Sequence, residues 1–199
     1  MLAYLFWHRP SDPGAVEAYE QALVAFHRSL ARSLPVGTRA SASFRVPELP
    51  WLGGPGGYED WYLLEDFAAL GVLNEAAVGR GHVSSHDQVA HRFGSGTGGL
   101  YALIEGEPCA EALGDARTSV WISRPLGQAS ASKRRDLGEL LGDGMAPARA
   151  SLWSRQMVFG PAPEFCLLAA EEAPAGVGTG RLPEGWSSQT IPREVLWSG

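Results

Sequence analysis

Residues 5–10, LFWHRP, are matched in the second half of the chain by residues 120–125, VWISRP, and both are short apolar runs closed by an Arg-Pro pair. Two further pairs of similar stretches follow in the same order, namely ASASFR (40–45) with ASLWSR (150–155), and DWYLL (60–64) with EFCLL (164–168). Each match is weak alone, but three matches in one order indicate a diverged internal repeat. The sequence therefore predicts two related halves, residues 1–112 and residues 113–199.

The stretches between the matched strands predict helices. After the first matched strand, apolar residues recur at helical spacing, in the series Val16, Tyr19, Leu23, Phe26 and Leu30. Asp12 and Pro13 precede this series and are typical of a helix start. In the second half, residues 130–141 predict a shorter helix at the equivalent place.

The first half continues with a second helical region and a closing strand. The apolar stripe of that region consists of Phe67, Leu70, Leu73 and Ala77. A capped turn of helix is expected over residues 85–93 and a strand over residues 100–105, which completes the ferredoxin-like order βαββαβ. In the second half, residues 173–185 are rich in Gly and Pro, and residues 190–197 predict a returning strand. The second unit is therefore expected to be degenerate.

Composition favours a globular cytoplasmic protein. The chain has 199 residues, 45% of them hydrophobic, which is enough to bury a core. No apolar run reaches the roughly 18 positions that span a bilayer, and the N-terminal stretch resembles a strand rather than a leader, so we expect neither a membrane partner nor secretion. A net charge of −6 argues against a nucleic-acid partner, since only Lys133, Arg134 and Arg135 cluster. Cys109 and Cys166 lie far apart, which suits a reducing compartment.

Two ferredoxin-like units in one chain resemble the dimeric α/β-barrel superfamily, and the order of elements covers nearly the whole chain. The resemblance implies an α+β fold in which two fused ferredoxin-like units form a barrel with helices outside. Members of the superfamily include cofactor-independent monooxygenases of antibiotic biosynthesis, polyketide cyclases, and haem-degrading and haem-using enzymes. No signature of a single subfamily is present, so the resemblance bears on the fold more than on the chemistry.

The glycine-rich residues 94–99, GSGTGG, do not predict a phosphate site. A phosphate-binding loop follows a strand and opens a helix, because the helix N-terminus then faces the anion. Here the string follows a predicted helix and opens the strand that begins at Leu100. We therefore expect a helix end and a flexible loop.

Four histidines are candidates for ligands or site residues. His82, His86 and His91 are close enough in sequence to suggest a metal site, but capping by Ser84 and Ser85 explains their neighbourhood, and we expect no metal. An axial haem ligand among these three, as in some superfamily members, stays open. His27 borders the first apolar stripe and is expected to be half-buried or to reach a pocket between helix and sheet.

Alternation along the matched strands sorts their side chains onto two faces. The apolar face, expected beneath the helices, carries Leu5, Trp7, Trp61, Leu63, Val120, Ile122, Phe165 and Leu167. The mixed face, expected to line the space between two sheets, carries Tyr4, Phe6, His8, Asp60, Tyr62, Ser123, Glu164 and Cys166. On the second strands, Arg45 with Ser43 and Arg155 with Trp153 are assigned to the mixed face by their charge.

The mixed face predicts a site for a small, partly aromatic, anionic metabolite, since ligand pockets are largely apolar with few polar groups. The expected ligand-binding residues are Arg45, Arg155, Asp60, Glu164, Tyr4, Phe6 and Trp153. A buried guanidinium needs a carboxylate or an anionic ligand, so we expect Arg45 beside Asp60 and Arg155 beside Glu164. His8 and Tyr62 are the catalytic candidates, because the second half has Ser123 and Cys166 instead.

Three functions stay open at this point. The preferred one is a binder or cofactor-independent enzyme, of monooxygenase, cyclase or isomerase type, that requires no metal. The second is a haem-binding member of the superfamily. The third is a non-catalytic assembly or partner-binding protein. The sequence decides neither between them nor whether the chain is a homo-oligomer.

Overall fold

The computed structural model describes residues 1–79, 81–106, 108, 110–124, 150–158, 163–169, 182 and 184–199. The predicted helix over residues 130–141, the basic cluster within it and Cys109 lie outside these ranges. None of the described helices is long and apolar enough to cross a membrane.

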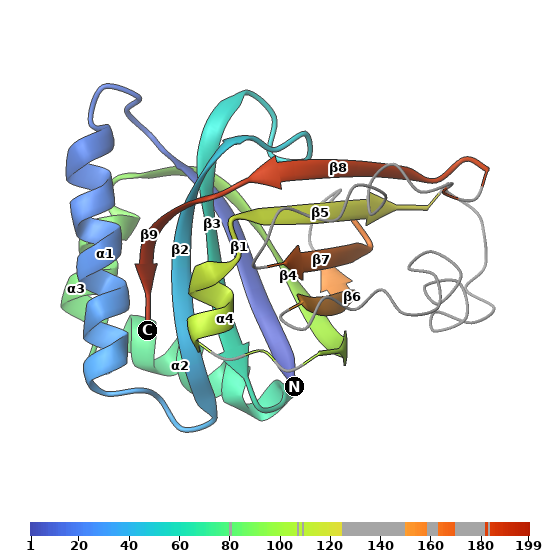
Figure 1. Ribbon diagram of the computed structural model, residues 1–199. Helices are drawn as coiled ribbons and strands as arrows, with labels where there is room; N and C mark the ends of the chain where they lie inside the picture. The colour runs from blue at the N-terminus through green and yellow to red at the C-terminus, as the bar shows by residue number, and fades with distance from the viewer. Residues whose placement is uncertain are drawn as a thin grey trace.

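The described residues form nine strands and four helices (Figure 1). In chain order they are β1 (Leu2–Pro10), α1 (Val16–Arg32), β2 (Thr38–Glu48), β3 (Pro55–Leu64), α2 (Phe67–Gly79), α3 (Val83–Ala90), β4 (Phe93–Glu105), α4 (Ala110–Asp115), β5 (Thr118–Ser123), β6 (Ala150–Val158), β7 (Phe165–Ala169), β8 (Ser187–Pro192) and β9 (Glu194–Ser198). The matched strands of the sequence are all present as β1 to β3 and β5 to β7. The expected returning strand over residues 190–197 is divided into β8 and β9.

The strands make one antiparallel sheet in the order β8-β5-β7-β6-β4-β1-β3-β2-β9. Two quartets within it, β4-β1-β3-β2 and β8-β5-β7-β6, place their strands in the same relative order. Only Arg193 separates β8 from β9 in the chain, yet these strands end opposite edges of the sheet. The sheet must therefore curl until its edges approach, and Figure 1 shows this curl. The fold is a barrel-like α+β fold.

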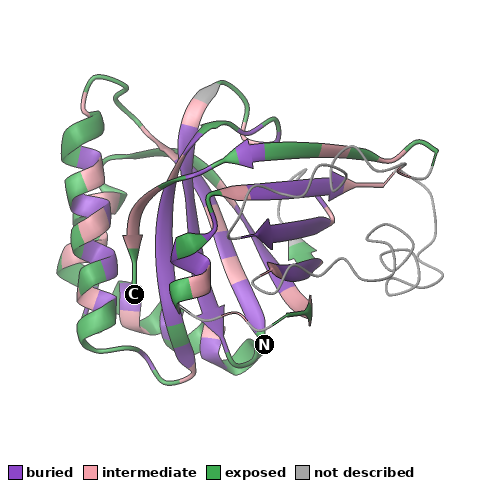
Figure 2. Ribbon diagram, viewed as in Figure 1, coloured by how far each residue is buried: buried purple, intermediate pink, exposed green. Residues whose placement is uncertain are grey.

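The large apolar side chains of β1 and β3 face the concave inside of the sheet, where α4 adds Leu113 to the same inner core, and not the helices α1, α2 and α3. Trp7 on β1 lies 5.4 Å from Trp121 on β5, measured between ring centroids. Three strands lie between β1 and β5, so in a flat sheet four spacings of roughly 4.8 Å would separate the two strands. The rings of Trp7 and Trp121 meet only because the sheet curls around them. The predicted placement of the apolar face beneath the helices is therefore wrong for the first half. Figure 2 shows the buried residues running along these central strands.

The helices cover the other face of β1 and β3. Tyr62 packs with Phe26 and Leu30 of α1 and with Leu73 of α2. The predicted helical stripe of α1 is buried from Tyr19 onwards, as expected. We call this side of β1 and β3 the helix-covered face. It carries the mixed residues of the first half, which the sequence placed between two sheets, namely Tyr4, Phe6, His8, Asp60 and Tyr62.

The predicted alignment of the two halves matches residues that lie in different apolar clusters. Leu5 lies opposite Trp61 in β1 and β3, and both belong to the inner core. The corresponding inner pair of β5 and β7 is Trp121 with Cys166. Val120, the predicted equivalent of Leu5, lies in a separate cluster on the opposite face. A slip of one residue reverses the face of every side chain in a strand.

The predicted equivalences of Asp60 with Glu164 and of Arg45 with Arg155 rest on the same alignment. An alignment that keeps the inner residues of both halves together would shift each strand by an odd number of residues, because short apolar matches define a strand but not its register.

A buried ion pair holds the corner between β8 and β9 inside the sheet. The Arg193 Nε lies 3.1 Å from Glu59 Oε1, and both side chains are fully buried. The indole nitrogens of Trp7 and Trp61 also donate to the Glu59 carboxylate, at 2.9 and 2.8 Å. The Arg193 guanidinium lies 3.3 Å above the ring of Phe44. Burial lowers the pKa of Arg193, and the Glu59 carboxylate opposes that effect.

The glycine-rich residues 94–99 lie within β4, so the predicted flexible loop is wrong. Gly96 lies opposite His8 on the neighbouring strand β1. A Cβ atom at Gly96 would come within 2.8 Å of the Trp7 carbonyl oxygen and 2.9 Å of the Phe6 ring. The glycines are therefore part of a strand, and they leave room for the aromatic side chains of β1.

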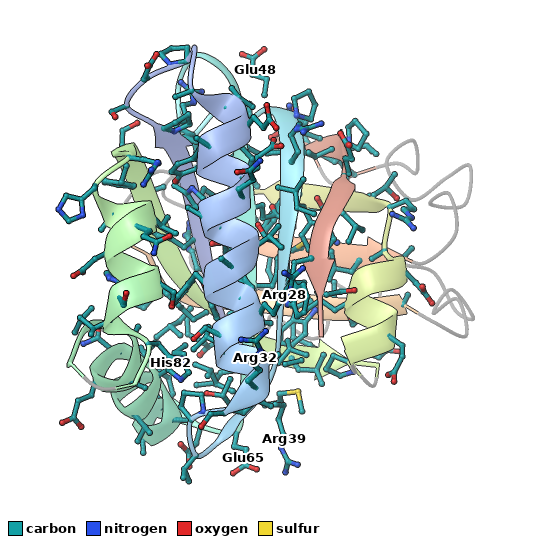
Figure 3. The ribbon with its side chains drawn as sticks, turned by 90° about the vertical axis from the view of Figure 1, so that its left-hand side faces the viewer. Arg28, Arg32, Arg39, Glu48, Glu65 and His82 are labelled. Carbon is teal, nitrogen blue, oxygen red and sulfur yellow. The ribbon has the colours of Figure 1, made fainter. Side chains whose placement is uncertain are left out.

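The helix α3 begins before its predicted caps. Ser84 and Ser85 lie inside its first turn, and the Ser85 hydroxyl donates back to the His82 carbonyl oxygen rather than capping an N–H. His82 is buried against the end of α1, with Nδ1 2.8 Å from Ser29 Oγ and Nε2 3.2 Å from the carbonyl oxygen of Ser33. Figure 3, which looks onto α1, shows His82 near the lower end of that helix.

Candidate functional site

A cavity of about 690 Å³ lies between the helix-covered face and the helices α1, α2 and α3. Five residues of the predicted site line it, namely Tyr4, Phe6, His8, Asp60 and Tyr62. Alternation along β1 and β3 brings these side chains to one face, and cross-strand pairing sets Phe6 opposite Asp60 and Tyr4 opposite Tyr62. The remaining lining residues are mostly aromatic or aliphatic and come from the three helices and from Phe93 at the start of β4.

A buried histidine and a buried carboxylate form the polar centre of the cavity. His8 Nε2 lies 3.1 Å from Asp60 Oδ2, and both side chains are almost fully buried. On the other side of the same ring, Nδ1 lies 2.6 Å from the Tyr19 hydroxyl of α1. The three side chains therefore form one line of hydrogen bonds from β3 through β1 to α1.

This line assigns the tautomer of His8. Among the described residues, the buried Tyr19 hydroxyl forms its hydrogen bond with His8 and with no other side chain. A phenolic hydroxyl has one proton to donate, so Tyr19 donates to Nδ1, and His8 carries its own proton on Nε2 and donates it to Asp60. In its neutral form the imidazole therefore points its basic nitrogen at Tyr19.

The polar contacts of the Asp60 side chain all involve one of its two carboxylate oxygens, Oδ2. Oδ2 lies 3.4 Å from His27 Nε2 and accepts a hydrogen bond from the Tyr62 hydroxyl at 3.3 Å, in addition to that from His8. His27 is held on its other nitrogen by Ser41 Oγ at 2.9 Å. Oδ1 is buried and has no hydrogen-bond partner among the described residues. One carboxylate oxygen of this lining residue therefore lacks a hydrogen-bond donor.

The pKa of Asp60 is shifted downward, whereas the pKa values of Tyr19 and Tyr62 are shifted upward. Burial alone raises the pKa of the Asp60 carboxyl, but the imidazoles of His8 and His27 outweigh it and hold that pKa well below its usual range. Burial, together with the Asp60 charge, raises the pKa of Tyr19 and of Tyr62. At neutral pH the site therefore holds a carboxylate and protonated tyrosine hydroxyls.

Aromatic rings form a continuous row beside the polar centre. Phe6 stacks on His8 at 5.2 Å and on Tyr4 at 6.4 Å, measured between centroids and with interplanar angles of 24°. Phe93, at the start of β4, stacks on Phe6 at 5.8 Å and is partly exposed. A row of nearly parallel rings offers a flat apolar wall, which suits a planar ligand.

The predicted arginine and carboxylate pairs do not contribute to this cavity. Arg45 binds both carboxylate oxygens of Glu20 on α1, at 2.8 and 2.7 Å, and pairs with Glu194, so its predicted position beside Asp60 is wrong. It lines a second cleft of about 660 Å³, together with Arg9.

The other predicted ligand-binding residues belong to the second strand quartet. The Glu164 carboxylate is bound by Arg124 at 2.6 and 2.5 Å, while the Arg155 backbone N–H donates to the Glu164 carbonyl oxygen at 2.7 Å. Trp153 lies in the inner core and donates its indole N–H to Ser151 Oγ. None of these three residues lines the cavity.

The sequence reasoning missed Tyr19, His86 and Phe93 as cavity residues. Tyr19 belongs to the predicted apolar stripe of α1, and its hydroxyl among aliphatic residues was the available signal. His86 contributes a ring from α3, and Phe93 was expected to end that helix, whereas it begins β4.

The described lining of the cavity fits haem poorly, because it provides one candidate histidine ligand and neither Arg nor Lys to pair with the haem carboxylates. Both ring nitrogens of His8 are engaged, whereas His86 Nδ1 has no hydrogen-bond partner among the described residues. Haem also carries two carboxylates, and the described lining includes neither Arg nor Lys. Among the described residues, no three His, Cys, Asp or Glu side chains are grouped so as to hold a metal ion.

Comparison with known proteins shows similarity of fold. No protein-family model and no curated protein matches the sequence. A protein of Fusobacterium nucleatum subsp. nucleatum ATCC 25586, provisionally described as a monooxygenase, matches with a TM-score of 0.65 at 7% identity, over 99% of this chain and 93% of that chain. Another from Lactobacillus acidophilus NCFM, described in the same way, matches with a TM-score of 0.54 at 10% identity, over 100% and 98%. An anthrone oxidase-like protein matches at 0.49 and 13% identity, over 98% and 93%, too weakly to support an argument.

Proposed function

We propose that the chain is an enzyme that binds a small, planar, partly aromatic metabolite in the cavity and removes a proton from it without a bound cofactor. The observation that carries this proposal is the hydrogen-bonded line Asp60–His8–Tyr19 inside a largely aromatic cavity. A base oriented by a carboxylate is the arrangement that general-base catalysis needs.

The direction of proton transfer follows from the assigned tautomer. As the ligand loses a proton to the Tyr19 oxygen, Tyr19 passes its own proton to His8 Nδ1. Asp60 stabilises the imidazolium that results, because its carboxylate accepts the Nε2–H bond. The raised pKa of Tyr19 keeps its hydroxyl protonated between turnovers, so the two transfers are coupled. General-base catalysis of this kind contributes roughly 10²–10⁴ in rate.

Oxygenation is the reaction that we favour after this first step. A ring-stabilised carbanion is electron-rich enough to reduce O₂ directly, and the balanced change is R₂CH₂ + O₂ → R₂C=O + H₂O. The carbon is oxidised, one oxygen atom enters the product and the other leaves as water. Support comes from the two proteins of similar fold that are provisionally described as monooxygenases. An isomerase or cyclase would begin with the same proton abstraction.

We also propose that the chain consists of two fused ferredoxin-like units, residues 1–112 and 113–199, with the site in the first unit alone. The shared strand order of the two quartets supports this division, although α4 runs across the boundary. Residues 113–199 contain no histidine. The second unit therefore has no counterpart of the His8 and Asp60 pair.

The proposal is tested with carbon acids fused to aromatic rings that carry a phenolic O–H, by following O₂ consumption and ketone formation. We expect one O₂ consumed per ketone formed. His8→Gln, which keeps a donor to Asp60 but no base, should lower kcat by roughly 10²–10⁴. Tyr19→Phe should lower it at least tenfold, with a melting temperature close to that of the wild type. Glu65→Gln, a change in an exposed carboxylate outside the cavity, serves as the control.

Two results would contradict the proposal. One is a His8→Gln variant that turns over at the wild-type rate. The other is a Soret band in protein expressed with added haem, if that band is lost in His86→Ala. The second result would favour the haem-binding alternative.

A further inference from the structure

We infer that the cavity selects uncharged ligands that present an O–H or N–H group to Asp60 Oδ1, and that it rejects carboxylates. The inference rests on the binding site of the proposed function, but it requires no reaction there. It reverses the preference for an anionic metabolite that the sequence suggested.

The first argument is the one-sided bonding of Asp60. Its Oδ2 accepts hydrogen bonds from His8 and Tyr62 and lies 3.4 Å from His27 Nε2, whereas its buried Oδ1 has no partner among the described residues. A carboxylate has about four acceptor sites on its two oxygens. A buried acceptor left without a donor is costly, so a ligand that supplies one gains affinity at this point.

The second argument is the charge of the lining. Asp60 is its only carboxylate, and the described lining includes neither Arg nor Lys. The arginines Arg9 and Arg45 line the other cleft and are already engaged there, Arg9 by the carbonyl oxygens of Gly54 and Gly56 and Arg45 by carboxylates. A ligand carboxylate would therefore meet Asp60 without a fixed cation nearby, and like charges in a buried site repel strongly.

The third argument concerns the apolar part of the ligand. The stacked rings of Tyr4, Phe6 and Phe93 form the wall beside Asp60, so a planar ring can lie against them while its substituent reaches Oδ1. Ring stacking binds any planar ring of suitable size, and it does not distinguish substituents. Discrimination between substituents must then come from the carboxylate.

Three probes of one ring system test the inference on the wild-type protein. They are 2-naphthol, which donates a hydrogen bond, 2-methoxynaphthalene, which does not, and 2-naphthoate, which is anionic. We expect 2-naphthol to bind roughly 10- to 100-fold more tightly than either of the others, the range that an unsatisfied buried acceptor implies. Equilibrium dissociation constants from fluorescence titration measure this order. Equal binding of 2-naphthol and 2-naphthoate, or no binding of any probe, would overturn the inference.

Asp60→Asn identifies the residue responsible. Removing the charge should narrow the gap between 2-naphthol and 2-naphthoate at least tenfold, while Glu65→Gln leaves it unchanged. An unchanged gap in a folded Asp60→Asn variant, judged by its circular dichroism, would contradict the assignment to Asp60. If that variant does not fold, the wild-type probe series decides the inference alone. Because only binding is measured, failure of the predicted order of binding in the wild-type protein would not bear on turnover by His8, and absence of turnover would not bear on the order of binding.

Discussion

At the scale of the residue, Asp60 decides the character of the cavity. The carboxylate is buried, with two hydrogen bonds and the nearby His27 imidazole at one oxygen, and the imidazoles of His8 and His27 favour its charged form. An isolated buried charge would be strongly destabilising, so the histidines and Tyr62 are needed for stability as well as for chemistry. Stability and function therefore depend on the same contacts.

This linkage predicts a pH dependence of stability. The pKa of Asp60 is lower in the folded protein than in the unfolded chain, so its contribution is fully present above the ordinary carboxyl value of about 3.9 and is lost as the pH falls further. We expect the difference in free energy of unfolding between wild type and Asp60→Asn to shrink as the pH is lowered below about 4. Urea denaturation across that range measures it. A difference that grows in acid would contradict the assigned direction.

At the scale of the element, β4 shows how a strand can be built to fit its neighbour. Its glycines lie opposite the aromatic residues of β1, with Gly96 facing His8 and Gly98 facing Phe6 in the strand register. Glycine weakens a strand by itself, but here it leaves space for large rings on the adjacent strand. The glycine-rich string therefore helps to form the aromatic wall of the cavity.

Replacing Gly96 by Ala should disturb that wall. The new Cβ would lie 2.8 Å from the Trp7 carbonyl oxygen and 2.9 Å from both the Phe6 and Phe93 rings. Because the backbone atom cannot move easily, we expect a loss of roughly 1–3 kcal/mol in the free energy of unfolding and weaker binding of 2-naphthol. Thermal and urea unfolding check the first effect.

Gly71 on α2 provides the matched control. A Cβ there meets no atom within 4 Å, so Gly71→Ala should be neutral or stabilise the helix by up to about 1 kcal/mol. Equal changes in the free energy of unfolding for Gly96→Ala and Gly71→Ala would show that crowding at Gly96 does not affect stability.

At the scale of the whole molecule, the curl of the sheet brings distant strands together. The rings of Trp7 and Trp121 touch across the inside, and Arg193 at the β8–β9 corner reaches Glu59 on β3. The ion pair lies in the inner core, where neither partner can be hydrated. Closure of the sheet therefore depends on a charge pair that is costly to break.

Arg193→Ala is expected to lower the free energy of unfolding by roughly 3–5 kcal/mol, because it leaves the buried Glu59 without its cation. Urea denaturation provides the measurement. The control is Arg39→Ala, which breaks the exposed pair between Arg39 and Glu65 seen in Figure 3 and should cost no more than about 1 kcal/mol. Similar losses in the two variants would argue against a special role for the Arg193 pair.

The sequence by itself determined the strands, most of the helices and the grouping of side chains along each strand. Tyr4, Phe6 and His8 were assigned to one face, with Asp60 and Tyr62, and the structure places all five around one cavity. This was possible because alternation in a strand and periodicity in a helix are local properties of the chain. The stripe of α1 was recognised for the same reason.

Only the tertiary structure decided which face the helices cover, how the two halves align and which groups meet. Local patterns do not show which face packs against which layer, since that depends on contacts such as Trp7 with Trp121, far apart in sequence. A one-residue change of register reverses a strand's faces without altering its composition, so Leu5 was matched with Val120, although the two lie in different apolar clusters. The line from Asp60 through His8 to Tyr19 joins two strands and a helix, and packing of that helix on the sheet brings these three residues within hydrogen-bonding distance.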